Sequence, residues 1–89
     1  MVDDQREKTM RERIGVRASA LVNNRAYLPR VRKVQNMIEA EEFDAIVSMA
    51  EHAKDNPAHY FMKIISIERL ESTLLHVRRL LKRSVEAMA

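Results

Sequence analysis

Apolar residues recur every three or four positions along most of the chain, which is the spacing of amphipathic helices. The first such stretch, over residues 6–24, places one apolar stripe within about a third of a helical wheel. Asparagine tolerates the left-handed conformation that ends many helices, so Asn23 and Asn24 predict the end of this helix. Residues 1–5 are expected to fray. The stripe comprises Met10, Ile14, Ala18, Leu21 and Val22.

Two more helices are predicted in the next stretch. Proline fits the first turn of a helix, so Pro29 predicts a second helix over 29–39. Carboxylates then crowd positions 39–44, where they favour a new helix N-terminus, so a third helix is expected over 41–54. Because neither Gly nor Pro separates the two, a single kinked helix over 29–54 remains the alternative.

The clearest break in the chain is Asn56 followed by Pro57, a cap and a first-turn residue, which predict a short helix over 57–65. Ser66 is then expected to cap the last helix, over 66–88. That helix would be about 30 Å long, enough to act as the backbone of the domain. Its stripe is the most regular in the sequence and comprises Ile67, Leu70, Leu74, Val77, Leu81 and Met88.

These elements predict an all-α fold, a compact four- or five-helix bundle with a long C-terminal helix, forming a single helical domain over 1–89. One glycine and two prolines leave little material for hairpins, so a β-rich fold is not expected. The short helix 57–65 and the long helix after it also fit a helix-turn-helix-like arrangement, which spacing alone leaves open.

Composition narrows the setting. The chain has no cysteine, so it offers neither a disulfide framework nor a thiolate metal site. Its apolar runs are too short for a membrane span, and its start is acidic rather than basic. The sequence therefore predicts a soluble, cytoplasmic protein with no membrane partner.

Charge is arranged in three blocks behind a net charge of +3. Residues 1–33 carry nine Lys/Arg against four Asp/Glu, residues 34–58 carry one against six, and residues 59–89 carry six against three. One interpretation is that the acidic middle neutralises the basic ends within the bundle. The other is that the two basic ends meet in space.

No set of residues predicts catalysis. Glu68, Ser72 and His76 share one helix face, but that face lies opposite the apolar stripe, where solvent prevents the pKa shifts that catalysis needs. The three histidines lack the spacing of a metal site, and Gly15 lies inside a predicted helix rather than in a phosphate-binding loop. We therefore expect no enzyme, no cofactor, no metal and no small-molecule substrate.

Basic residues at the start of the second helix carry the first functional hypothesis. Arg30, Arg32 and Lys33 occupy a first turn, where the helix dipole disfavours cations, so a compensating anion is expected. A nucleic-acid phosphate or the protein's own segment 39–44 would meet that need. The predicted nucleic-acid contacts are Arg25, Arg30, Arg32 and Lys33, with a second patch at Arg79, Lys82 and Arg83.

The alternative hypothesis is a protein-interaction or homodimerisation module. Leu75 and Leu80 lie outside the main stripe of the last helix, on opposite sides of it. Apolar residues therefore cover more of this helix than one neighbour buries, which predicts a partner interface. Coverage of the two leucines by the first and fourth helices would remove that need.

Overall fold

The computed structural model describes residues 2–88, and within them the side chains of residues 2–4, 7 and 85–88 are outside the description. This part of the chain contains helices and no strand, which confirms the all-α prediction. The elements are α1 (Val2–Val22), the 3-10 turn η1 (Arg25–Tyr27), α2 (Leu28–Met37), α3 (Ala40–Glu51), α4 (Pro57–Ile64) and α5 (Leu70–Met88).

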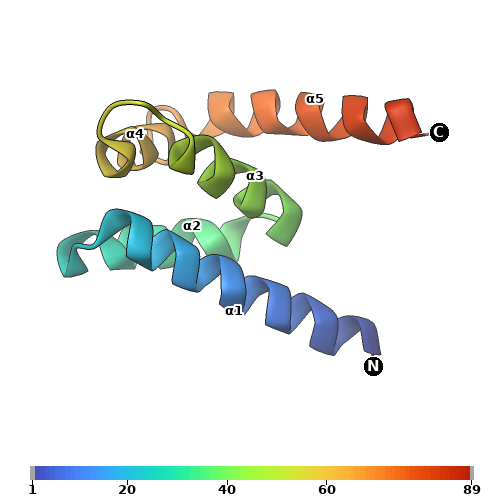
Figure 1. Cartoon of the computed structure of the whole chain (residues 1–89), viewed down its shortest axis with the longest axis horizontal. Coiled ribbons are helices and arrows are strands. Elements are labelled where there is room, and N and C mark those ends of the chain that lie inside the picture. Colours follow the sequence, from blue (N-terminus) through green and yellow to red (C-terminus); the bar gives the residue numbers. More distant parts are fainter. Residues whose placement is uncertain (1, 89) are drawn as a thin grey trace.

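The central helix is α3, which lies between α1 and α5 (Figure 1). Six of its residues are buried: Ala40, Glu42, Phe43, Ile46, Val47 and Ala50. In contrast, α5 packs mainly against α3 and then runs on past it (Figure 1). The last helix is long, as expected, but α3 is the element around which the others pack, because regular periodicity marks a long amphipathic helix and not the number of neighbours that surround it.

Two aromatic rings sit at the middle of the core. Phe43 of α3 and Phe61 of α4 are both fully buried, and their ring centroids lie 6.3 Å apart in an edge-to-face arrangement. This geometry places the positive edge of one ring against the negative face of the other. Branched aliphatic residues fill the rest of the core, with Val31, Val34, Ile46, Val47, Ile65 and Val77 fully buried.

Asparagines end or begin helices at two of the predicted places. Asn23 has a φ of 48° and follows the last residue of α1, and the side chain of Asn24 accepts a hydrogen bond from the Ala26 N–H. Asn56 accepts from the His59 N–H, and Pro57 opens α4 behind it. At the other end α1 begins at Val2, so the backbone of residues 2–5, where fraying is predicted, is helical; Met1 lies outside the described residues.

The stretch from Leu28 to Glu51 forms two helices rather than one. Ile38 and Glu39 are extended and separate α2 from α3. A capping box begins α3, in which the Glu39 side chain accepts from the Glu42 N–H and the Glu42 side chain accepts from the Glu39 N–H. Reciprocal capping by two glutamates supplies the start signal that no Gly or Pro provides here.

The last helix starts later than the sequence predicts. Residues 65–69 form a turn, and α5 begins at Leu70 instead of residue 66. The hydroxyl of Ser66 donates to the Lys63 carbonyl, so it closes α4 and does not cap α5. As a result Ile67, expected in the buried stripe, is 84% exposed. Met88, at the end of the predicted stripe, has a side chain outside the described residues.

Candidate functional site

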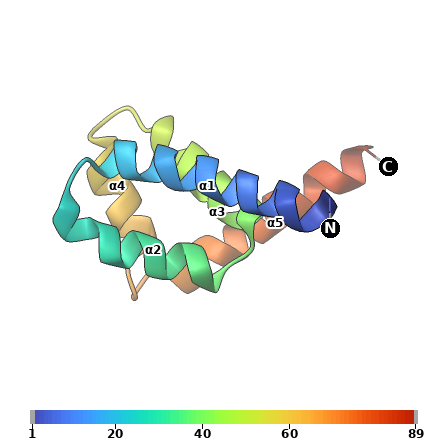
Figure 2. The ribbon, with the colours of Figure 1, turned by 90° about the horizontal axis from the view of Figure 1, so that it is seen from below.

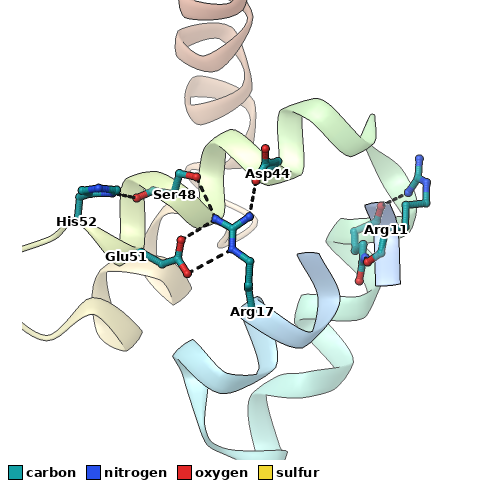
Figure 3. A network of polar contacts seen from close by, with 7 residues as sticks. Arg11, Arg17, Asp44, Ser48, Glu51 and His52 are labelled. Carbon is teal, nitrogen blue, oxygen red and sulfur yellow. Dashed lines mark hydrogen bonds and ion pairs between the residues drawn. The ribbon is translucent and has the colours of Figure 1, made fainter. Parts of the chain in front are cut away.

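Arg17 of α1 binds two acidic residues of α3, Asp44 and Glu51 (Figure 3). Its guanidinium donates to Asp44 Oδ1 at 2.6 Å, to Glu51 Oε1 at 2.6 Å and to Ser48 Oγ at 3.1 Å. Hydrogen bonding to Glu51 and then to Asp44 raises the pKa of Arg17, and the bond from Arg17 lowers the pKa of Glu51. The contact joins α1 to α3.

A second ion pair joins α5 to α3. Arg78 Nε donates to Glu42 Oε2 at 2.6 Å, and the Glu42 side chain is only 9% exposed. Burial raises the pKa of Glu42, but the hydrogen bond from Arg78, the bond from the Glu39 N–H and the charge of Arg78 together outweigh burial, so the net pKa is lowered. The interpretation that the acidic middle neutralises the basic ends is confirmed for these residues.

Arg30 binds neither of the anions predicted from the sequence but a backbone carbonyl. Its Nε and Nη2 donate to the carbonyl of Ile65, at 3.0 and 2.7 Å. Ile65 closes α4, so a cation that is unfavourable at the start of α2 is placed at a helix C-terminus, where the dipole favours it. The expected pairing of Arg30 with the acidic segment 39–44 is wrong, since Arg17 and Arg78 hold Asp44 and Glu42.

Arg11 and Gln35 join α1 to the end of α2, and neither residue belongs to a predicted site. Arg11 donates to the carbonyls of Gln35 and Ile38, while Gln35 Nε2 donates to the Arg11 carbonyl at 2.7 Å. The amide of Gln35 lies against Gly15, where an added Cβ would be 3.3 Å from Gln35 Oε1. The one signal for this contact is a glycine inside a predicted helix.

The predicted nucleic-acid residues do not form one surface. Arg25, Arg32 and Lys33 are exposed on η1 and α2. The second patch, at Arg79, Lys82 and Arg83, is exposed on the C-terminal half of α5. Figures 1 and 2 both place the start of α2 and the end of α5 at opposite ends of the long axis, so these patches lie apart.

The two leucines of the alternative hypothesis are left partly uncovered. Leu75 is 51% exposed and Leu80 is 42% exposed. The first and fourth helices therefore do not cover them fully. They lie on different sides of α5 and border no cavity described below, so they stay a predicted interface.

A groove between α2 and the start of α5 is lined by Ile67, the most exposed large apolar side chain of the described residues. Ile67 is 84% exposed and Met37 is 59% exposed, and both border this groove. Its volume is about 420 Å³. One wall is formed by Arg30, Lys33 and Met37, and the other by Ile67, Leu70, Glu71 and Leu74.

Sequence reasoning misses this groove for one physical reason. The periodicity of residues 66–88 places Ile67 in the buried stripe, whereas the turn at 65–69 rotates it out of that stripe. Leu70 is buried and Leu74 partly buried, and these least exposed apolar lining residues form the floor of the groove, whereas Ile67 and Met37 form its rim.

A second hollow, of about 580 Å³, lies along α1 beside Asp44 of α3. Its apolar residues are Met10, which is partly buried, and Ile14, which is 3% exposed. Both belong to the core, and the remaining lining is polar, including Arg6 and Arg13. The hollow therefore presents charge but no exposed apolar side chain.

Neither metal nor membrane sites appear in the described part of the chain. It holds no group of three His, Asp or Glu side chains able to bind a metal ion, and none of its helices is long and apolar enough to cross a membrane. Of the Glu68, Ser72 and His76 row, Glu68 lies in the turn before α5 and all three are exposed.

No protein-family model, curated protein or solved structure matches this chain.

Proposed function

We propose that this chain is a non-enzymatic protein-binding module whose groove between α2 and α5 receives an amphipathic helix of a partner protein. The observation that carries the proposal is the 84% exposure of Ile67 in a groove that the buried Leu70 also lines. A single exposed aliphatic residue is ordinary on a protein surface. Two of them, Ile67 and Met37, facing one hollow with an apolar floor are typical of a docking surface.

The energetic reason is the apolar area that a partner would remove from water. Fully burying an isoleucine or methionine side chain is worth about 1.5–3 kcal/mol. Ile67 is almost wholly available for that gain and Met37 more than half available. Since Ile67 makes little contact with its own core, the bundle gains almost nothing from an isoleucine at this position, whereas a partner would.

The shape of the groove favours a helix over a small ligand. Small-molecule pockets enclose most of the ligand surface, but Met37 and Ile67 stand exposed at the rim of this groove. Its walls come from α2 and from the turn and first helical residues of α5, and four of its seven lining residues are apolar. An apolar stripe with polar flanks is the surface that fits such a groove.

The peptide experiment uses the ¹⁵N-labelled 89-residue chain. A designed helical peptide of about 18 residues, with leucines at i, i+3, i+4 and i+7 and only Ala and Gln elsewhere, is titrated while amide shifts are recorded. We expect shifts at Met37, Ile67 and Leu74, and binding at least about tenfold weaker in an Ile67→Ser/Met37→Gln variant. Val16→Ser is the matched control, because Val16 is 71% exposed on α1, away from the groove.

Nucleic acid is the competing outcome. Labelled duplex and single-stranded DNA and RNA are titrated at about 50 and 200 mM salt with the natural protein and an Arg25/Arg32/Lys33→Ala variant. Salt-sensitive binding lost in this variant, with no peptide shifts in the groove, would overturn the proposal in favour of phosphate contact. Shifts of the Ile67 and Met37 amides with protein concentration alone would overturn it in favour of a second copy of this chain.

A further inference from the structure

The two walls of the groove carry opposite charge. Arg30 and Lys33 stand on the α2 wall, and Glu71 stands on the α5 wall. Lys33 and Glu71 are exposed, and among the described residues neither takes part in an ion pair. The groove is thus apolar at its floor, positive along one edge and negative along the other.

Neighbouring charges do not cancel this asymmetry. Arg78 also lies on α5, but its charge is matched by Glu42 of α3. Arg30 bonds to a neutral backbone carbonyl, so its positive charge remains on the α2 wall. In the turn and the first residues of α5, Glu68 and Glu71 are negative and Arg69 is positive, so this wall is net negative and faces a wall with two cations.

An amphipathic helix with oppositely charged flanks has only one favourable direction in such a groove. Its apolar stripe must face the floor, so one flank lies against α2 and the other against α5. Reversing the helix end for end with the stripe still facing the floor exchanges the flanks. If the flanks carry opposite charges, one direction pairs both edges and the other sets like charges together, which is costly at an interface.

We infer that the partner is a helix with an acidic flank that lies against Arg30 and Lys33 and a basic flank that lies against Glu71, bound in a single direction. This inference rests on the proposed function, since it specifies the occupant of the same groove. Such flanking pairs contribute modestly to affinity and decide which helix fits and which way it points.

Three peptides with the same leucine stripe test the charge pattern at about 50 mM salt. The first has glutamates on one flank and lysines on the other, the second has glutamates on both, and the third has lysines on both. We expect the first to bind about three- to tenfold more tightly than either of the others, a difference that shrinks as salt is added. A Lys33→Glu or a Glu71→Lys variant should lose most of that preference.

Direction is read from a nitroxide label at the N-terminus of the two-signed peptide. Arg30, bonded to Ile65, marks the end of the groove near turn 65–69, and Met37, the last residue of α2, marks the other end. We expect the label to broaden the amide of one of these residues in the natural protein. In a Lys33→Glu/Glu71→Lys variant, with the same net charge, we expect it to broaden the other.

Failure of the charge-directed docking and failure of the proposed groove binding give different experimental results. Equal binding of all three peptides, with groove amides shifting, or equal broadening at both ends overturns the charge-directed docking and leaves the groove as a binding site. Absence of groove shifts with every peptide overturns the proposed function itself.

Discussion

Arg78 Nε lies 2.6 Å from Glu42 Oε2, and the same Glu42 side chain accepts the Glu39 N–H at the start of α3. The Glu42 carboxylate thus caps the N-terminus of the central helix and also holds the long C-terminal helix against it. A residue that caps a helix is here also a tertiary contact, so its loss affects two elements at once.

We predict that Arg78→Ala lowers the free energy of unfolding by about 1–2 kcal/mol, because a nearly buried carboxylate loses its charged partner while Arg78 itself is more than half exposed. Urea unfolding near pH 7 measures the change. The control is Arg79→Ala, the exposed neighbouring residue, with an expected change within about 0.5 kcal/mol. Equal effects of the two substitutions would contradict a role for the pair.

The same pair gives a pH dependence with a defined sign. The pKa of Glu42 is lower in the folded protein than the value of about 4.3 expected in the unfolded chain. Its stabilisation is therefore present above about pH 4.3 and disappears as the pH falls through the lower folded-state pKa. The stability difference between the natural protein and Glu42→Gln should shrink below about pH 4; a difference that stays constant down to about pH 2.5 would sink this account.

Substitution of Arg30 is predicted to change stability rather than to remove a free phosphate contact. Arg30→Ala leaves the Ile65 carbonyl at the end of α4 without its two donors, at a cost of about 1–2 kcal/mol. Arg32→Ala, two positions away and exposed, should cost less than about 0.5 kcal/mol. Thermal unfolding of both variants tests this, and a stable Arg30→Ala protein would show that the contact contributes little.

Gly15 is predicted to be coupled to Gln35. Replacing a glycine inside a helix by alanine gains about 1 kcal/mol, but a Cβ here would lie 3.3 and 3.4 Å from the amide oxygen and nitrogen of Gln35. We expect Gly15→Ala to be nearly neutral alone and stabilising by about 1 kcal/mol in a Gln35→Ala background. Denaturant unfolding of the four proteins measures the coupling, and the same gain in both backgrounds would refute it.

Much of the fold follows from local sequence signals. Asn23 and the Asn56–Pro57 pair mark helix ends that depend on backbone conformation and capping within a few residues, so the sequence alone locates them. The start of α5 cannot be located from such local signals. Ser66 has the character of an N-cap, yet its hydroxyl is used by the preceding helix, and only the completed α4 determines that choice.

The candidate groove could not be predicted from the sequence because it depends on the turn at 65–69, which separates Ile67 from the apolar stripe of α5. Periodicity assigns Ile67 to the same stripe as Leu70 and Val77, and a turn of a few residues separates it from them. The partners of the arginines were equally hidden. Arg30 donates to a backbone carbonyl 35 positions away. Every residue has a backbone carbonyl, so the sequence does not indicate which one an arginine will bind.

The bond from Arg30 to Ile65 ties one wall of the groove to the turn that presents Ile67 on the other. A partner would therefore meet a surface already held in shape, and association would not have to order the turn at the expense of conformational entropy. Freed from that bond, the same apolar residues would remain while the entropic penalty of docking would rise. Preorganisation of the groove is thus the consequence of an arginine whose position at a helix start otherwise looks unfavourable.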